Sequence, residues 1–291
     1  MDTLLQTIEA HYPKFSKGQR RIAGFLVDSF DEAAFMTAAK LGEKVGVSES
    51  TVVRFAYTLG LDGYPALQDA LQEMLRHRLT SVQRIRLAAN IPQQAVPRTV
   101  LTSDMNNIRA TIDMIDNAGF DGAIEALLNA RRIYVLGVRS AMALAQFFAY
   151  YLDYVCNDVV FVNGAVQDLH ERMLRVGPED VCFGISFPRY SARTVEAMKY
   201  AGSRGATLIA LTDQTTSPLA AVSNITLCAR SDMASFADSL VAPLSLLNAI
   251  IVAIGLKRKD EAYRHLSQLE EIWHEEGVYL GEKTEREKQP E

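Results

Sequence analysis

The sequence predicts an α/β fold class, in which an all-α head is joined to a doubly wound, flavodoxin-like domain with a five-stranded parallel sheet. Two observations lead to this prediction. From Leu4 to about Arg78 the apolar residues recur only with helical spacing. From Arg132 the pattern changes to short runs rich in β-branched and aromatic residues, and each gap between them can hold a helix. Strands that alternate with helices form parallel sheets, which bind ligands where strand ends meet helix starts.

The chain of 291 residues is long enough for more than one domain. We expect a helical head at 1–80, a linker with a connecting helix at 81–117, the sheet domain at 118–257, and a C-terminal helix with a disordered tail at 258–291. The content of 48% hydrophobic and 22% charged residues is ordinary for a globular protein. The sequence shows neither a leader nor an apolar run of ~20 residues, which predicts a cytoplasmic protein with no membrane partner.

The three cysteines, Cys156, Cys182 and Cys228, lie far apart, in or beside apolar segments. Their spacing is not that of a metal site, so we expect buried thiols, no metal and no cofactor. The net charge of −5 comes from the chain after residue 90, because the first 90 residues carry nearly equal numbers of basic and acidic side chains. A near-neutral head on an acidic body is compatible with a head that binds nucleic acid and a body that binds a metabolite.

In the head, Ser16 is expected to be the N-cap of one of the helices, and the stretch from Thr37 to Tyr64 is the more informative part. Thr37 is a suitable N-cap for a short helix, Gly46 for a tight turn, and Ser48 for the N-cap of a second helix that ends near residues 59–60. Two short helices joined by a turn with glycine form a helix-turn-helix.

The second helix has two different faces. Stepping 100° per residue places Val52, Phe55, Ala56 and Leu59 on one side, where they can pack. The opposite side is polar, and Arg54 on it is the side chain best suited to a bidentate contact with guanine. We expect double-stranded DNA as the partner of these residues, with basic side chains on the phosphates. The candidate DNA-binding residues are Lys40, Lys44, Ser48, Ser50, Thr51, Arg54 and Tyr57. The alternative is an ordinary helical hairpin with a solvated polar face.

The residues from Val47 to Tyr64 follow the pattern V-S-x-x-T-V-V-R-F, then L-G, then G-Y. This pattern resembles that of the RpiR-type (MurR/RpiR) family of bacterial transcriptional regulators. The resemblance covers about the first 80 residues. It implies a helix-turn-helix domain that reads DNA with its second helix, followed by a sugar-isomerase-type (SIS) domain that senses phosphorylated sugars.

The sequence predicts that a helix after Tyr64 and Pro65, running to about Leu79, closes the head. A hinge is expected at residues 90–97, followed by a connecting helix to about Asp116. The connecting helix carries an apolar stripe made of Leu101, Met105, Ile108, Ile112 and Ile115. We expect this stripe to pack on its own domain. Alternatively, it joins two subunits, since two half-sites on DNA require a symmetric assembly, and a homodimer or homotetramer is therefore expected.

In the body, the predicted strands are 132–137, 159–163, 181–186, 207–212 and 225–229. A long apolar helix is expected from Phe236 to Leu256, a charged helix after it, and disorder in residues 281–291. The body resembles the SIS fold.

Two strand-to-helix loops each carry serine and arginine, and they are expected on either side of the point where strand order reverses. Hydroxyls, guanidinium groups and helix N-termini all favour anions, so a small anionic effector such as a sugar phosphate is expected there. The candidate ligand-binding residues are Gly137, Arg139, Ser140, Ser186, Arg189, Tyr190 and Ser191. The SIS motifs are usually G-x-G-x-S and S-x-S-G-x-T, and here Arg139 and Arg189 stand at glycine positions of those motifs. Both arginines either bind the anion or pair with acidic residues of a neighbouring subunit.

Sugar isomerisation needs a general base near the substrate carbon. The available side chains are His170, Glu171, Glu196, Asp232 and Asp238, and none lies in a distinguishing motif. We therefore expect a DNA-binding regulator that senses a phosphorylated sugar or a related anionic metabolite, without enzymatic turnover. The alternative is a phosphosugar isomerase with an accessory helical domain.

Overall fold

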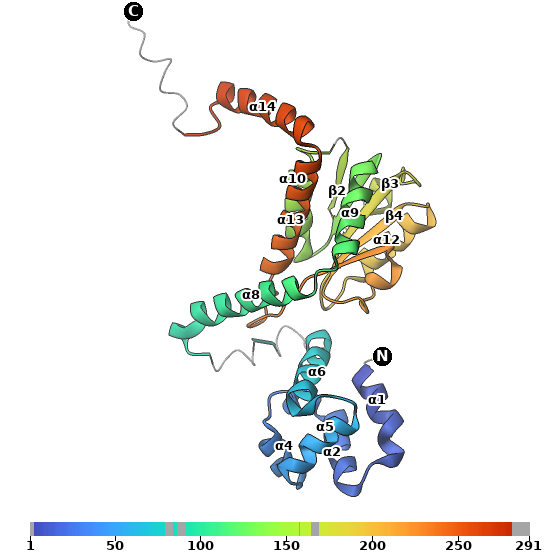
Figure 1. Ribbon diagram of the computed structural model, residues 1–291, viewed down its shortest axis with the longest axis vertical. Helices are drawn as coiled ribbons and strands as arrows, with labels where there is room; N and C mark the ends of the chain where they lie inside the picture. Colours follow the sequence, from blue (N-terminus) through green and yellow to red (C-terminus); the bar gives the residue numbers. More distant parts are fainter. Residues whose placement is uncertain (1–2, 79–83, 86–90, 157, 164–168, 281–291) are drawn as a thin grey trace, which may run out of the picture. The chain divides into compact units, whose positions relative to one another are not determined.

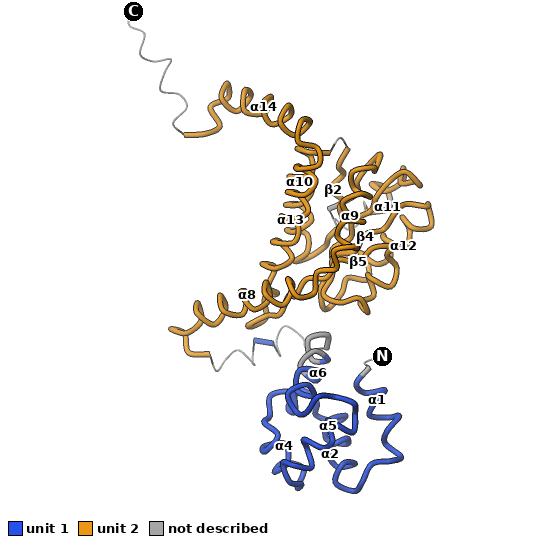
Figure 2. Tube along the Cα trace, in the orientation of Figure 1, with its two compact units in different colours: residues 1–86 blue, residues 87–291 orange. Residues whose placement is uncertain are grey.

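The structure is a computed structural model that describes residues 3–78, 84–85, 91–156, 158–163 and 169–280. The chain forms two compact units, unit 1 at residues 1–86 and unit 2 at residues 87–291 (Figure 2). The predicted tail at 281–291 and the first residue of the predicted hinge lie outside the described residues.

Unit 1 is helical, as the periodicity predicted. Its elements are α1 (Thr3–His11), η1 (Tyr12–Lys14), α2 (Lys17–Asp28), α3 (Phe30–Ala33), α4 (Ala38–Val45), α5 (Glu49–Thr58) and α6 (Gly63–Arg78). The helices bury one common core, which includes Ile22, Leu41, Phe55 and Leu67, each fully inaccessible to solvent. This burial is the main stabilising contribution to so small a unit.

Local signals set the ends of these helices. Ser16 caps α2 in a reciprocal capping box with Gln19, and the Thr37 side chain accepts a hydrogen bond from the backbone N–H of Lys40 at the start of α4. Gly46 ends α4 with a φ of 68°, a left-handed conformation that glycine adopts without steric cost. All three roles were predicted from the sequence.

Unit 2 contains a five-stranded parallel sheet with the order β2-β1-β3-β4-β5. The strands are β1 (Arg132–Gly137), β2 (Val159–Asn163), β3 (Asp180–Ile185), β4 (Thr207–Thr212) and β5 (Ile225–Cys228). This is the flavodoxin-like order that was predicted, and strand order reverses between β1 and β3.

Alternate residues of each strand point to opposite faces, so the sheet is covered on both sides (Figure 1). Ile133 and Val135 join one core cluster with α9 (Asn117–Asn129), α10 (Ala141–Leu152) and α13 (Val241–Lys257). Tyr134 and Leu136 join the other cluster with α11 (Leu169–Arg172) and α12 (Ala192–Ser203), close to the short η3 (Ala220–Val222). Cys156 and Cys182 are buried and Cys228 is half-buried, and burial raises the pKa of the Cys182 thiol to about 12.

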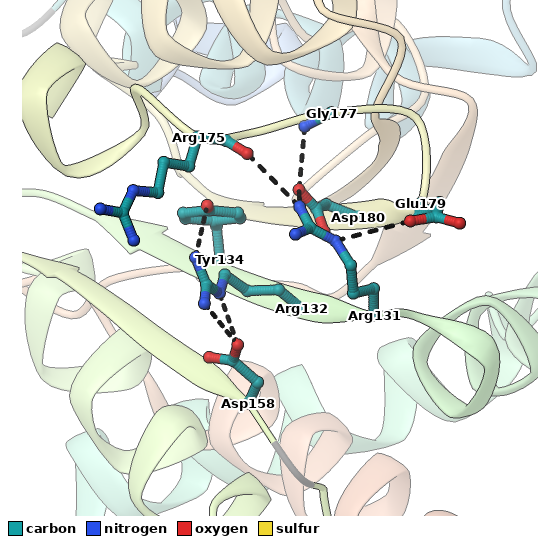
Figure 3. Close-up of polar contacts among 8 residues, drawn as sticks. All are labelled: Arg131, Arg132, Tyr134, Asp158, Arg175, Gly177, Glu179 and Asp180. Carbon is teal, nitrogen blue, oxygen red and sulfur yellow. Dashed lines mark hydrogen bonds and ion pairs between the residues drawn. The ribbon is translucent and has the colours of Figure 1, made fainter.

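Polar contacts tie together the amino-terminal ends of β1, β2 and β3 (Figure 3). Arg131 donates two hydrogen bonds to the buried carboxylate of Asp180, at 2.9 and 2.7 Å, and the backbone N–H of Gly177 donates a third, at 2.9 Å. Arg132 donates to Asp158 at 2.6 Å. These contacts lie at the opposite edge of the sheet from the predicted effector loops.

Two predictions about unit 2 are wrong. The connecting helix, α8 (Val96–Asp113), follows η2 (Gln93–Ala95), and most of its apolar stripe does not pack on its own domain. Leu101 is 67% exposed, Met105 52%, Ile112 61% and Ile115 42%. The long apolar helix α13 begins at Val241, not at Phe236, because the preceding residues Asp238 and Ser239 hydrogen-bond to other parts of unit 2.

After α13 the chain continues in α14 (Lys259–Glu276), which is the charged helix that was predicted to follow the apolar one. Within the described residues, no single helix has the length and apolar composition of a membrane span, and α13 and α14 meet that test only as a pair bent by 103°.

Candidate DNA-binding and effector sites

The predicted helix-turn-helix is formed by α4, the turn at Gly46 and α5. A Cβ atom on Gly42 in α4 would lie 2.8 Å from the carbonyl oxygen of Val47, so only glycine permits this close approach of α4 to the turn. Gly42 and Gly46 therefore allow the chain to turn closely from α4 into α5.

The two faces of α5 separate as the helical spacing predicted. Val52, Phe55 and Ala56 are fully buried in the core of unit 1. On the other face Ser50 and Arg54 are exposed, and Tyr57 is 60% exposed, while Thr51 is half-buried at the edge. A helix held firmly by one face and polar on the other is suited to enter a major groove.

Ser48 occupies the N-cap position of α5, but its side chain does not cap the helix. Its hydroxyl instead lies 3.0 Å from the hydroxyl of Ser50 and 2.8 Å from that of Thr51. The prediction of Ser48 as a side-chain cap is therefore wrong. Arg54 donates from Nε to the carbonyl oxygen of Ser50, one turn earlier in the helix, at 3.3 Å.

The two lysines of α4 differ in their surroundings. Lys40 is exposed near the start of the helix. The ammonium group of Lys44 lies 2.7 Å from the carboxylate of Glu32 and 5.9 Å from the ring centre of Phe25. Because the Lys44 charge is already paired, Lys40 is the better candidate for a phosphate contact.

The candidate effector loops follow β1 and β3, which are adjacent in the sheet. Gly137 pairs with Ile185 at the carboxyl ends of these strands, so the loops begin side by side. A Cβ atom on Gly137 would lie 2.6 Å from the carbonyl oxygen of Ala141, which makes glycine necessary at this turn. The structure therefore brings the two predicted loops to one edge of the sheet.

Arg139 and Arg189 are the two non-glycine residues in the described chain that have a positive φ, 58° and 64° respectively. Left-handed backbone costs about 1 kcal/mol or more for a residue with a Cβ atom. Both side chains are exposed, one on each of the two loops. Glycine-like backbone occupied by arginine at both loops points to a function for the guanidinium groups, because glycine would avoid the strain.

In the β1 loop, Ser140 stands at the start of α10, but its hydroxyl makes no cap to that helix. It donates instead to Oδ2 of Asp238 at 3.0 Å. Asp238 follows β5 by ten residues, and the sequence indicated it only as one of several acidic side chains.

In the β3 loop, Ser186 is buried and its hydroxyl accepts a hydrogen bond from the backbone N–H of Ser191 at 3.1 Å. Ser191 caps α12 by accepting from the backbone N–H of Thr194. These two hydroxyls hold the loop at the helix N-terminus, where the positive end of the dipole favours an anion.

Tyr190 in the same loop donates from its hydroxyl to Oδ1 of Asp213 at 2.7 Å, and Asp213 also accepts from Thr212 at 3.2 Å. Asp213 is 4% exposed and follows β4 directly. Sequence reasoning missed Asp213 and its role in orienting Tyr190. Its position directly after an apolar strand, at the same edge as the two loops, is the signal by which the sequence could have identified it.

Two of the side chains considered as general bases have other contacts in the described part of the chain. Asp238 is engaged by Ser140, Asp232 contacts α8 through its backbone, and the side chain of His170 lies outside the described residues. Among the described residues, no group of three or more His, Cys, Asp or Glu side chains is arranged to hold a metal ion.

Residues 2–78 match the model of the helix-turn-helix domain of the rpiR family, and residues 126–253 match the model of the SIS domain. HexR, an HTH-type transcriptional regulator of Pseudomonas aeruginosa, is 25% identical over 284 residues, which cover 93% of this chain and 95% of that protein. The sugar isomerase domain of an RpiR transcription factor from Sphaerobacter thermophilus is similar in structure, with a TM-score of 0.59 and 25% identity over 61% of this chain and 99% of that one.

NanR of Vibrio vulnificus, solved in complex with ManNAc-6P, shares the fold over 93% of this chain and 98% of its own, with a TM-score of 0.57 and 21% identity. A helix-turn-helix unit followed by an SIS domain defines a class of two-domain bacterial regulators. The chain belongs to the RpiR family of transcriptional regulators, as its α5 sequence predicted.

Proposed function

We propose that this protein binds an operator through α5 and that a phosphorylated sugar, bound at the carboxyl edge of its sheet, changes its affinity for that operator. The observation that carries the proposal is the pair of strained arginines, Arg139 and Arg189, on two loops that begin side by side.

For DNA binding, the exposed face of α5 supplies Ser50, Arg54 and Tyr57 as candidates for base contact, with Thr51 at its edge. Lys40, with a weaker contribution from Lys44, supplies positive charge for the phosphates, and Ser48 adds a hydroxyl at the start of the helix. A regulator that binds chromosomal DNA acts in the cytoplasm, which is where we place it.

For the effector, the two loops offer cations and hydroxyls around a helix N-terminus. Arg139, Ser140 and Arg189 are exposed there, and Gly137, Ser186, Tyr190 and Ser191 shape the loops that carry them. A phosphate group satisfies such donors well, since guanidinium groups bind its oxygens in bidentate fashion. NanR, which shares the fold, was solved with a phosphorylated sugar, and this supports the same class of effector here.

We further propose that the SIS domain acts as a sensor without turnover. The acidic side chains of the described carboxyl edge are engaged in structural roles, Asp213 with Tyr190 and Asp238 with Ser140. The relatives named above are transcriptional regulators, which favours a sensor over an isomerase.

The regulator is proposed to be a homodimer that uses the exposed apolar face of α8. Leu101, Met105 and Ile112 form one stripe on this helix, each at least 52% exposed, and Ile115, 42% exposed, follows just after the helix ends. A self-complementary apolar helix face buries itself most simply against the same face of a second copy, and two copies present two heads to two half-sites.

The test is fluorescence-anisotropy binding to the DNA upstream of the protein's own gene, against a shuffled duplex at near-physiological salt. Glucose 6-phosphate, ribose 5-phosphate, N-acetylmannosamine 6-phosphate and inorganic phosphate are each added. We expect a preference for the native duplex that at least one sugar phosphate shifts. Equal, weak and salt-sensitive binding to both duplexes would contradict the proposal, and steady turnover of a sugar phosphate by the pure protein would establish the isomerase alternative.

A further inference from the structure

The segment Arg230–Ser239, which we call the bridging segment, joins β5 to α13 and contacts both the β1 loop and α8. Near its end, Asp238 accepts the hydrogen bond of Ser140 at 3.0 Å. The next residue, Ser239, donates from its hydroxyl to Oδ1 of Asp104 on α8 at 2.6 Å. Two consecutive residues of the bridging segment thus bind the candidate effector loop and the connecting helix.

The other end of the bridging segment is bound to the same helix by buried groups. Asn107 of α8, 2% exposed, donates from Nδ2 to the carbonyl oxygen of Asp232 at 2.8 Å and accepts from the Asp232 backbone N–H at 3.2 Å. Thr111, one turn further, accepts from the backbone N–H of Arg230 at 2.9 Å. Buried polar groups keep their partners because an unsatisfied one is costly. The bridging segment is therefore joined to α8 at both of its ends.

A bound anion and Asp238 compete for Ser140. A serine hydroxyl has a single hydrogen to donate, and in the structure Asp238 accepts it. A phosphate oxygen that takes this donor must replace the carboxylate, and the two negative charges repel one another at such short range. Effector binding at Ser140 and the Ser140–Asp238 hydrogen bond are mutually exclusive.

We propose that the bridging segment couples the effector site to α8. The effector displaces Asp238 from Ser140, and Ser239 and Asp232 carry the displacement to α8, the helix that follows the linker from unit 1 in the sequence. This inference rests on the proposed function, because it specifies how the effector at the same loops changes DNA affinity. Allosteric coupling of this kind requires an element whose position both sites influence, and the bridging segment has the contacts of such an element.

The first experiment replaces the competing charge. Asp238→Asn keeps an acceptor for Ser140 and removes the negative charge, so it is expected to raise the affinity for the most effective sugar phosphate of the panel at least threefold. Calorimetry on the full-length protein measures this affinity, with inorganic phosphate as a second probe. An unchanged or lower affinity in Asp238→Asn would overturn the competition between Asp238 and the anion.

The second experiment breaks the link to α8 without touching the effector loops. Ser239→Ala, Asp104→Ala and the double variant are each expected to bind the sugar phosphate as the unchanged protein does. Their effector-induced change in operator affinity is expected to fall at least threefold. The double variant is expected to lose no more than either single one, because both remove the same hydrogen bond. Ser245→Ala is the matched control, since that hydroxyl donates only within α13, to the carbonyl oxygen of Val241.

Full coupling in Ser239→Ala and Asp104→Ala, or additive losses in the double variant, would overturn the role of the bridging segment. Loss of sugar phosphate binding in these variants would do so as well, because it would assign the segment to the effector site itself. Failure of the proposed function has a different signature, since the unchanged protein would then show no effector-dependent shift in operator affinity.

Discussion

At the scale of single residues, the two candidate effector loops depart from the usual SIS motifs at positions where backbone conformation matters. Arg139 and Arg189 adopt left-handed backbone that glycine would adopt freely. The sequence has arginine where the usual SIS motifs have glycine. The structure adds that both arginines have the positive φ that glycine adopts readily. A strained backbone lowers the stability of the protein, and functional sites keep such strain when the side chain is needed. If Arg139 and Arg189 bind the effector, replacing them by glycine should weaken binding without lowering stability.

We expect Arg139→Gly and Arg189→Gly each to weaken sugar phosphate binding at least tenfold without lowering the melting temperature. Relief of about 1 kcal/mol of backbone strain offsets the extra chain entropy of glycine. Arg139→Ala and Arg189→Ala are the controls, because they lose the same charge while the strain stays. Calorimetric binding and thermal unfolding measure the two effects. Unchanged binding in both glycine variants would move the effector site elsewhere.

On α5, Arg54→Ala is expected to reduce the preference for the operator over a shuffled duplex by about 2 kcal/mol, roughly thirtyfold. Lys40→Ala is expected to weaken binding to both duplexes alike and to reduce the salt slope by about 1, as the loss of one phosphate contact does. Anisotropy titrations at several salt concentrations measure both quantities. If Arg54→Ala keeps the full preference, the exposed face of α5 does not read the bases.

At the scale of elements, the amino-terminal and carboxyl-terminal ends of the strands carry different groups of residues. The carboxyl edge holds the candidate effector loops, and the amino edge holds the ion pairs that join β1, β2 and β3 (Figure 3). The Asp180 carboxylate is fully buried there and accepts hydrogen bonds from Arg131 and from the backbone of Gly177. These contacts concern the stability of unit 2, and they lie apart from the effector loops.

Asp180→Ala is expected to lower the free energy of unfolding of unit 2 by about 2 kcal/mol, since it removes several hydrogen bonds from a buried acceptor. Asp158→Ala is the matched comparison. Its carboxylate is 37% exposed, and we expect a loss of less than about 1 kcal/mol. Urea unfolding followed by tryptophan fluorescence reports on unit 2, because the single tryptophan of the chain, Trp273, lies in α14. Equal losses in the two variants would contradict the importance of burial at Asp180.

At the scale of the whole molecule, a single copy of the chain leaves the apolar stripe of α8 exposed to solvent. Leu101, Met105 and Ile112 lie in one line along this helix and expose a substantial apolar surface to water. A second copy would cover it, and a two-fold assembly would present two recognition helices to a symmetric operator.

Leu101→Glu combined with Ile112→Glu is expected to convert the protein to a monomer and to weaken operator binding at least tenfold, because each head then binds its half-site alone. Sedimentation velocity gives the assembly state and anisotropy the affinity. Thr102→Glu is the control for each single glutamate, since it adds one negative charge at an exposed position on the same helix, away from the stripe. A dimer that survives the double change would exclude α8 as the interface.

Much of this protein was determined by local sequence. The caps at Ser16 and Thr37, the turn at Gly46, the two faces of α5 and the positions of the five strands all follow from short-range stereochemistry and hydrophobic period. The tertiary structure alone decided three further matters: the strain at Arg139 and Arg189, the pairing of Tyr190 with Asp213, and the path of the bridging segment between Ser140 and α8. Each of these depends on which loops meet at one edge of the sheet. Such partners lie up to 135 residues apart in the chain, beyond the reach of any local pattern.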